Sequence, residues 1–198
     1  MRKVIKTSIF MCAALIMLPL TVLFYVFSIL FGKDALVAGF SQFVSLLPGK
    51  LGVYLRVGFL RFVLKRCSPD AVVSFLVLFS QQDTELSPGC YIGPQCNIGK
   101  CKIGRNTLLG SGVHIMSGKG QHNFEDINTP IKDQGGSFTK VEVGENCWIG
   151  NGALVMANIG DNSVVAAGSV VINDVPAGAI VGGNPAKVLK MRGESTTV

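Results

Sequence analysis

The sequence predicts a mainly β chain: a parallel β-helix built from six-residue repeats, preceded by apolar and basic N-terminal helices. Three observations predict it. An aliphatic residue returns every six positions through much of residues 86–183, the first 67 residues are apolar and basic, and one long loop interrupts the repeat. A six-residue period is typical of a parallel β-helix, in which each coil buries its apolar face only against the coils above and below.

The first segment, residues 1–34, is predicted to enter a membrane. Ser8 to Phe31 carries no charged residue, and this length suffices to reach across a hydrocarbon core. The apolar stretch is long for a signal peptide and lacks a small-x-small cleavage site, so we expect it to be retained. Pro19 in its middle predicts a kink or a fold back, so the segment either spans or re-enters the membrane. A buried helix of a soluble domain is the alternative.

The positive charge is concentrated at the same end of the chain. The net charge is +6, but residues 1–67 hold nine Lys or Arg and one acid, Asp34, whereas residues 68–198 hold nine basic and eleven acidic residues. Basic residues within an apolar segment favour a membrane surface as partner. The repeat region has few aromatic residues and no basic run, so we expect membrane lipids and no nucleic acid.

Residues 35–67 are predicted to form basic amphipathic helices at the membrane interface. Three basic residues would share one side of a helix that begins near Gly49, with apolar residues on the other side. These basic residues are Lys50, Arg61 and Lys65. Gly52 and Gly58 weaken the helix. Residues 68–85 are predicted to be a transition or cap, whose apolar run at 71–79 forms either the first strands or the cap.

Residues 86–183 are predicted to be the β-helix, followed by a C-terminal tail over residues 184–198. The repeating aliphatic positions are Leu86, Ile92, Ile98, Ile103, Leu109, Ile115, Val143, Ile149, Val155, Ile159, Val165 and Val171. Four places after such a residue the side chain is small or β-branched, and Cys90, Cys96 and Cys147 take this position. We therefore expect these cysteines to be core residues. Because the chain has no Cys-x-x-Cys pair, we expect no metal site.

A loop at residues 117–140 interrupts the repeat and is the predicted catalytic loop. Long loops in compact domains are usually functional or disordered. This one contains His122, one of only two histidines, and imidazole is a suitable general base near neutral pH. A solvated loop histidine is the alternative interpretation. We expect the other histidine, His114, to be a surface or packing residue.

Several linked motifs resemble a known family. They are Cys147-Trp148-Ile149-Gly150, Ala166-Ala167-Gly168-Ser169-Val170-Val171 and Gly183-Asn184-Pro185-Ala186-Lys187. With the repeats and the histidine loop, they resemble the hexapeptide-repeat acyltransferases over about residues 86–192, and more closely the sugar O-acetyltransferases, including bacterial polysaccharide O-acetyltransferases. The resemblance implies a left-handed parallel β-helix, a homotrimer with active sites between adjacent subunits, acetyl-CoA as co-substrate and no metal.

The resemblance also implies roles for particular residues. His122 matches the catalytic histidine that removes the proton of an acceptor hydroxyl, with Glu125 or Asp126 as a possible orienter of its imidazole. Asn97 and Trp148 match positions on the substrate side. The positions implied for coenzyme A are Gly150, Asn151, Ala167, Asn173, Lys187 and Lys190. The family's usual lysine after the Ala-Gly-Ser-Val-Val run is replaced here by Ile-Asn, so the contacts to the phosphates fall to the two C-terminal lysines.

These features predict an acetyl-CoA-dependent O-acetyltransferase that acts on a sugar hydroxyl of a lipid-linked or surface-polysaccharide glycan. Since the thioester is cytosolic, we expect the β-helix to face the cytosol at the bacterial inner membrane. Basic residues flank the apolar segment on both sides, so the positive-inside bias does not decide its orientation. An N-acetyltransferase on an amino sugar and a non-catalytic trimeric membrane scaffold are the alternatives. A γ-type carbonic anhydrase would need three zinc-binding histidines, and the chain has two.

Overall fold

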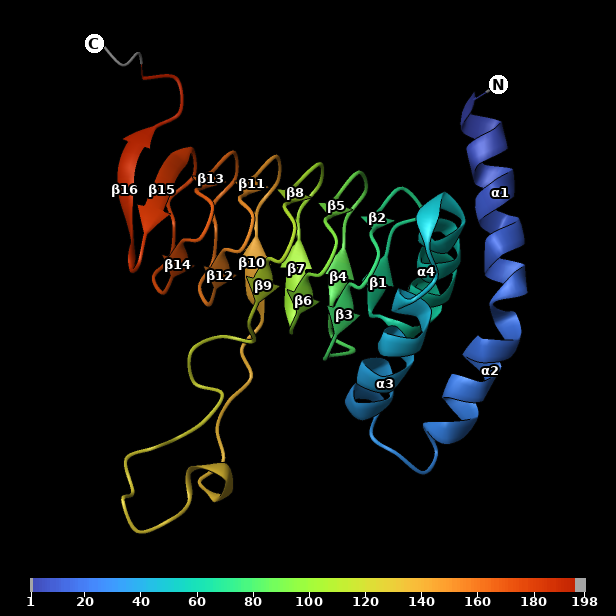
Figure 1. Cartoon of the computed structure of the whole chain (residues 1–198), viewed down its shortest axis with the longest axis horizontal. Coiled ribbons are helices and arrows are strands. Elements are labelled where there is room, and N and C mark those ends of the chain that lie inside the picture. Colours follow the sequence, from blue (N-terminus) through green and yellow to red (C-terminus); the bar gives the residue numbers. More distant parts are fainter. Residues whose placement is uncertain (1, 195–198) are drawn as a thin grey trace.

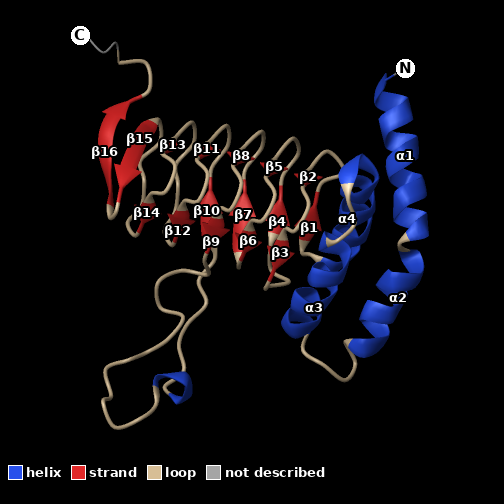
Figure 2. Ribbon diagram, in the orientation of Figure 1, coloured by secondary structure: helices blue, strands red, loops and turns tan. Residues whose placement is uncertain are grey.

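The computed structural model describes residues 2–194 of the 198-residue chain. Four helices come first, and short strands follow that wind into a parallel β-helix, so that the helices cover one end of the stacked coils (Figure 1). Between the strands lie regular turns and one long loop that projects from the side of the β-helix (Figure 2). The predicted mainly β architecture of parallel coils is confirmed.

Each of the first four coils contributes one strand to each of three sheets, and parallel neighbours within a sheet come from successive coils. In the later coils Ile159 and Val175 continue the first sheet only as isolated bridges. The four-stranded sheet contains β1 (Arg66–Cys67), β4 (Glu85–Leu86), β7 (Cys101–Ile103) and β10 (Val141–Val143). The five-stranded sheet contains β3 (Leu78–Phe79), β6 (Asn97–Ile98), β9 (His114–Ile115), β12 (Leu154–Val155) and β14 (Val170–Val171). The seven-stranded sheet contains β2 (Val72–Val73), β5 (Tyr91–Ile92), β8 (Leu108–Leu109), β11 (Trp148–Ile149), β13 (Val164–Val165), β15 (Ala179–Gly183) and β16 (Ala186–Met191).

The repeating aliphatic residues form the interior of the coil. All twelve predicted positions are buried, each with at most 2% of its surface exposed. The three predicted core cysteines are buried as well, and burial raises the pKa of Cys90 to about 12. One side chain per strand thus points inward and stacks on its equivalents in the coils above and below, which is how a repeat too small to fold alone acquires a core.

The stacked coils begin earlier than the predicted boundary at residue 86. Cys67 pairs in register with Leu86, Val73 with Ile92, and the next strand likewise pairs with β6. The apolar run in the predicted transition segment therefore forms β2 and β3, which complete a first coil that begins with β1. The other predicted domain boundaries remain predictions.

At the other end, the predicted tail contributes a strand. β16 runs antiparallel to β15, with Ile180 paired to Lys190 and Gly183 paired to Ala186. The strand covers what would be the open edge of β15, which limits edge-to-edge association of exposed backbone groups. Residues 195–198 of the predicted tail lie outside the described residues.

The N-terminal apolar segment forms two helices, α1 (Arg2–Ile16) and α2 (Leu18–Phe27). Among the described residues no single helix has both the length and the apolar composition needed to cross a membrane. The two helices taken together, from Ser8 to Phe27, meet these criteria, but they are bent by 46° at the break between them. Pro19 lies in the first turn of α2, next to the break, where its missing N–H costs no intrahelical hydrogen bond.

The following segment forms α3 (Lys33–Ser45) and α4 (Gly49–Val63). The second of these lies between α1 and the first coil, so most of its surface faces protein (Figure 1). Gly58 makes this possible, because a Cβ there would stand 3.0 Å from the backbone of Ala13 in α1. The glycine that weakens the helix in isolation is therefore the point at which two helices approach closely.

A buried arginine fastens α4 to its surroundings. The Arg56 side chain is 1% exposed. Its Nε donates to the carbonyl oxygen of Val73 in β2 at 2.9 Å, and its Nη1 donates to the carbonyl oxygens of Leu47 and Ser45 near the end of α3. Burial lowers the pKa of this guanidinium, but its bonds to three carbonyl oxygens offset much of the cost of desolvation.

Candidate active site

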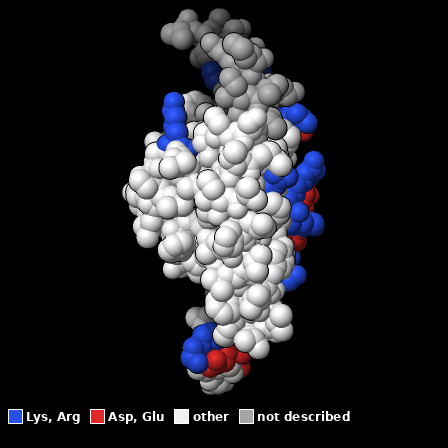
Figure 3. Space-filling model, turned by 90° about the vertical axis from the view of Figure 1, so that its right-hand side faces the viewer, with Lys and Arg blue, Asp and Glu red and all other residues white. Residues whose placement is uncertain are grey.

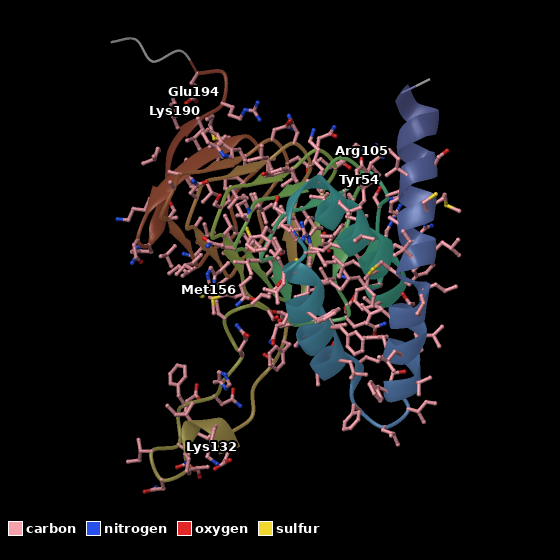
Figure 4. The ribbon with its side chains drawn as sticks, turned by 45° about the vertical axis from the view of Figure 1, so that its right-hand side comes forward. Tyr54, Arg105, Lys132, Met156, Lys190 and Glu194 are labelled. Carbon is pink, nitrogen blue, oxygen red and sulfur yellow. The ribbon has the colours of Figure 1, made fainter. Side chains whose placement is uncertain are left out.

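The predicted catalytic loop leaves the β-helix after β9 and returns at β10, at the corner between the five-stranded and four-stranded sheets. It contains one short 3-10 helix, Ile131–Asp133. Figure 4 shows Lys132 at the outer end of the loop and Met156 beside the place where the loop joins the coils. The loop is thus a long arm fixed at one corner of the third and fourth coils.

The two limbs of the loop are tied together by backbone hydrogen bonds. The N–H of Thr139 donates to the carbonyl of Ser117 at 3.0 Å, and the N–H of Ser137 donates to the carbonyl of Gly120 at 2.6 Å. Further out, the N–H of Asn123 donates to the carbonyl of Gly135 at 3.0 Å. His122 therefore lies on an ordered two-limbed ribbon, which restricts where its imidazole can reach.

Gly136 is a residue of the loop that the sequence reasoning missed. A Cβ at this position would overlap the carbonyl oxygen of Gln121 and would stand 2.9 Å from the backbone nitrogen of His122. The return limb can pass this close to the histidine only because the residue lacks a side chain. The adjacent pair Gly135-Gly136 inside the loop was the signal available in the sequence.

The two carboxylates predicted as possible orienters of the His122 imidazole accept hydrogen bonds from other residues of the loop. Glu125 Oε2 accepts from the N–H of Phe124 at 3.2 Å. Asp126 accepts from the hydroxyl of Thr129 at 2.7 Å and from the N–H of Asn128 at 2.9 Å, and these bonds lower the pKa of its carboxyl. The His122 side chain is exposed, and within residues 2–194 it is hydrogen-bonded to neither carboxylate.

Asn97, predicted on the acceptor side, lies beside the root of the loop. It pairs in register with His114, and both line a cavity of about 180 Å³ together with Gln121. Gln121 directly precedes His122 in the chain. The structure therefore places one predicted substrate residue next to the limb that carries the predicted base, and His114 is the histidine that lines the cavity itself.

Three of the residues implied for coenzyme A gather at a different corner, between the seven-stranded and five-stranded sheets. Gly150 lies under the next coil so closely that a Cβ would meet the nitrogen of Ala167 at 2.5 Å. The carbonyl of Asn151 accepts from the N–H of Gly168 at 2.8 Å. Trp148 in β11, two residues before Gly150, is 56% exposed on the outer face of the seven-stranded sheet.

The other residues implied for coenzyme A lie elsewhere. Asn173 lines a cavity of about 440 Å³ at the loop corner, together with Lys119, Lys140 and Asn158. Lys187 and Lys190 lie on β16, at the end of the β-helix opposite the helices (Figure 1). Within one chain the five-stranded sheet separates the His122 corner from the Asn151 corner, so a single groove cannot use both.

The root of the loop is held by a cluster of charges that the sequence reasoning also missed. Lys140 Nζ stands 2.6 Å from Asp83 Oδ1 and 2.6 Å from Glu85 Oε1. Lys65 lies 3.0 Å from the same aspartate oxygen, and Lys100 lies 3.7 Å from the other oxygen of this carboxylate. The cluster fixes the end of the loop to the edge of the first two coils.

These ion pairs shift the titration of their members. Hydrogen bonding to Lys140 lowers the pKa of Glu85. Burial alone would raise the pKa of Asp83, but hydrogen bonds from Lys140 and Lys65 lower it. Burial alone would likewise lower the pKa of Lys140, yet its bonds to the two carboxylates raise it. All three groups are therefore held in their charged forms.

Comparison with known proteins supports the resemblance at the level of fold and enzyme class. No protein-family profile matches the chain. Over 62 residues it is 45% identical to a 2,3,4,5-tetrahydropyridine-2,6-dicarboxylate N-acetyltransferase of Clostridium perfringens, covering 30% of this chain and 26% of that enzyme. A maltose O-acetyltransferase from Clostridium difficile 630 superimposes with a TM-score of 0.61 at 21% identity, covering 81% of this chain and 89% of that one.

A third similar protein was solved with ligands bound. A variant of AntD, an N-acyltransferase from Bacillus cereus, in complex with dTDP-4-amino-4,6-dideoxyglucose and coenzyme A, has a TM-score of 0.53 at 16% identity, covering 62% of this chain and 70% of that one. The chain spans less than half the length of the curated relatives it matches. The structural likeness shows the shared β-helix fold, and the relatives with this fold and repeat are named acyltransferases.

Proposed function

We propose that the protein is an acetyl-CoA-dependent O-acetyltransferase of a sugar hydroxyl, with His122 as general base. The observation that carries the proposal is the placement of His122 on a hydrogen-bonded ribbon, directly after Gln121, which lines a cavity together with Asn97. The coils alone present flat surfaces with few titratable groups, and this loop carries a candidate base one residue away from the lining of a concave site. Such a constellation on an acyltransferase fold supports acyl transfer.

The proposed step transfers the acetyl group directly. The imidazole of His122 takes the proton of the acceptor hydroxyl while that oxygen attacks the thioester carbonyl carbon. The tetrahedral oxyanion is stabilised by backbone N–H groups of a facing subunit. When the carbon–sulfur bond breaks, the thiolate leaves with the bonding electrons and takes the proton from the imidazolium, which gives free coenzyme A and the acetyl ester.

The split between the two corners supports a homotrimer with sites between subunits. The His122 corner of one chain would face the corner of Gly150, Asn151 and Ala167 of its neighbour. An apolar column on the seven-stranded sheet offers a surface for such a contact: Tyr91, Leu108 and Trp148 stack in register and are 38%, 43% and 56% exposed. Large exposed apolar side chains in one column are typical of association surfaces.

Acetyl-CoA as co-substrate is supported by the coenzyme A bound to AntD. In this chain Lys187 and Lys190 would contact the phosphates, with Asn173 and the small residues at the corners along the pantetheine arm. The acceptor we propose is a lipid-linked or surface-polysaccharide glycan, with the protein at the cytosolic face of the bacterial inner membrane. The apolar N-terminal helices and the basic residues beside them favour such a location.

A second candidate is N-acetylation of an amino sugar. It is favoured by two comparisons, the N-acetyltransferase of Clostridium perfringens and AntD with its bound amino sugar nucleotide. The fold serves both reactions, and a base beside the acceptor suits either nucleophile. The two candidates differ in the acceptor atom alone, so one acceptor panel separates them.

The test is acetyl transfer from acetyl-CoA to membrane glycolipid extracts, followed by thiol release and by mass spectrometry of the product. We expect an alkali-labile acetyl ester, and a loss of roughly 100-fold or more in kcat for His122→Ala, the range typical of general-base removal. Lys102→Ala is the matched control, because Lys102 is half-exposed on β7 and pairs with Glu142 at 3.6 Å, away from both corners. Its kcat should match that of the wild type.

Other outcomes would change the assignment. An alkali-stable amide would favour the amino-sugar reaction. Full activity of His122→Ala, with loss in His114→Ala, would move the base to His114, the histidine that lines the cavity. No thiol release with any hydroxyl or amine acceptor would favour the non-catalytic scaffold.

A further inference from the structure

We propose that the outer face of α1 and α2 docks onto an anionic lipid bilayer and lies in its plane, so that the coils stand off from the membrane. We call this surface the apolar face. It is made by thirteen large apolar side chains between residues 9 and 31, each 39% to 82% exposed. These are Ile9, Met11, Leu15, Ile16, Leu18, Val22, Leu23, Tyr25, Val26, Phe27, Ile29, Leu30 and Phe31.

The apolar face is continuous and free of charge. Figure 3 looks onto this side of the molecule, where Lys, Arg, Asp and Glu appear only toward the edges. Between Ser8 and Phe31 the chain contains no charged residue. Monomeric soluble proteins rarely expose apolar patches larger than a few hundred Å², so a face built by thirteen large side chains between residues 9 and 31 indicates a partner.

The inner side of the same helices is packed on protein. Ala13 and Ala14 of α1 lie against Gly58 of α4, and both alanines are buried. Phe24 of α2 makes edge-to-face contacts with Phe40 and Phe59, at centroid distances of 5.6 and 6.3 Å. To span a bilayer, α1 and α2 would have to leave these contacts. With the contacts kept, lipid reaches only the outer side, and the helices lie in the plane of the interface.

Basic side chains border the apolar face. The Arg61 guanidinium lies 4.8 Å from the centre of the Phe10 ring in α1. Lys50 lines a cavity of about 270 Å³ together with Phe10, and Lys33 begins α3 two residues after Phe31. Basic residues at the rim of an apolar surface complement the negative headgroups of anionic lipids.

A second protein is a poorer fit to this face than a bilayer. Protein interfaces usually carry about one hydrogen bond per 100–200 Å². The two hydroxyl-bearing residues of α2 and its C-cap that lie toward this side already have internal partners: Tyr25 donates to the carbonyl of Phe62, and Ser28 donates to the carbonyl of Tyr25. The face therefore offers apolar area and a charged rim with few free hydrogen-bonding groups, which is what a lipid surface requires.

The first test is flotation of the full-length chain with phosphatidylcholine vesicles, with and without phosphatidylglycerol. We expect binding, strongest to the anionic vesicles, and a roughly tenfold or larger loss of the partition coefficient for the Leu15→Glu, Leu23→Glu double variant, since each change places a charge in the apolar layer. The matched control is Leu189→Glu, whose side chain is 64% exposed on β16 at the opposite end, compared with 70% for Leu15. Circular dichroism establishes that the variants are folded.

The second test measures depth. Of the six cysteines, Cys12 on α1 is exposed and the other five are buried, so a fluorophore can be attached to the unmodified chain at this one site. Nitroxide lipids labelled near the headgroup should quench it more than lipids labelled near the chain end. Stronger quenching from the bilayer centre would show a spanning segment and overturn the proposal. Unchanged vesicle binding of the double variant would also overturn it. The same holds if the wild-type chain does not bind vesicles and sedimentation shows that it dimerises through the apolar face.

Discussion

Gly136 and His122 lie on opposite limbs of the predicted catalytic loop, and a Cβ on the glycine would stand 2.9 Å from the backbone nitrogen of the histidine. Gly136→Ala must push the two limbs apart, because the new methyl group also overlaps the carbonyl oxygen of Gln121. We expect kcat of the proposed transfer to fall by roughly 10- to 100-fold, since displacement of a catalytic group by about 1 Å has effects of this size. Melting of the coils should change little, because the loop lies outside their core.

The neighbouring glycine is the control for this prediction. Gly135 has a positive φ of 74°, but a Cβ there would meet nothing within 4 Å. Gly135→Ala therefore adds backbone strain of about 1 kcal/mol without a steric clash. Equal losses of kcat in both variants would mean that strain in the loop, and not the position of His122, is responsible.

Lys140 gives a prediction that depends on pH. Glu85 and Asp83 have lowered pKa values in the folded state, so their contribution to stability is present above their ordinary values of 4.5 and 3.8 and is lost as the pH falls through the lower folded values. Lys140→Met removes the central cation and keeps the length of the side chain. At pH 6 we expect the variant to be less stable by about 1 kcal/mol, since the pairs are partly exposed.

The sign of the change with pH follows from the same linkage. Protonation of the two carboxylates ends the advantage of the wild type, so the difference in melting temperature between wild type and Lys140→Met should shrink from pH 6 to pH 3. Melting curves at a series of pH values measure this difference. A gap that stays constant across the series would show that Lys140 acts through packing and not through charge.

The coils were predictable because their interior is periodic. The first coil lies before the predicted start of the β-helix, and this has a physical reason. The first coil keeps the six-residue spacing with Cys67, Val73 and Phe79, all of them buried. A thiol and a phenyl ring replace the aliphatic side chains at two of these positions, and Leu86 follows Phe79 by seven positions instead of six. A search for repeating aliphatic residues therefore finds its first coil one turn too late.

The candidate site was predictable only in part. The loop and His122 stand out because they interrupt a strict repeat. The charge cluster does not stand out, since Lys65, Asp83, Glu85 and Lys140 are far apart in the chain and meet only because each coil stacks on the last. Asn151 and Asn173 lie on different corners of the coil, although the family resemblance implied both for coenzyme A.

The packing of α1 on α4 was also hidden from the sequence, and it makes a stability prediction. At Gly58 a Cβ would stand 3.0 Å from the carbonyl carbon of Ala13 and 3.0 Å from the nitrogen of Ala14. Gly58→Ala should therefore destabilise the chain by roughly 1–3 kcal/mol through overpacking, even though alanine is the better helix former. Thermal or denaturant unfolding of the full chain measures the change.

Gly39 in α3 provides the opposite case. It is exposed, and a Cβ there would meet nothing within 4 Å. Gly39→Ala should stabilise the chain by up to about 1 kcal/mol, because alanine loses less backbone entropy in a helix. If Gly58→Ala were stabilising as well, α1 would not be held against α4 in solution, and the in-plane arrangement of the apolar face would lose its support.

The docking proposal and the proposed function together place the site well above the bilayer. Helix layers pack about 8–10 Å apart, and successive coils are spaced by about 4.8 Å. The loop leaves after β9, in the third coil, so two helix-layer spacings and two to three coils put its root on the order of 30 Å from the axis of α1. A lipid-linked acceptor must present its hydroxyl at that height.

This height predicts a dependence on the length of the glycan. In vesicles, a lipid carrying a single sugar should be acetylated poorly, and lipids with progressively longer glycans should be acetylated faster. In detergent micelles that release the acceptor from a planar surface, the short acceptor should regain the rate of the long one. Equal rates for short and long acceptors in vesicles would contradict the upright arrangement of the coils, because a site close to the bilayer has no reason to favour a long glycan. Acetyl transfer to the same acceptors, measured in vesicles and in micelles, decides whether the site lies far from the bilayer or close to it.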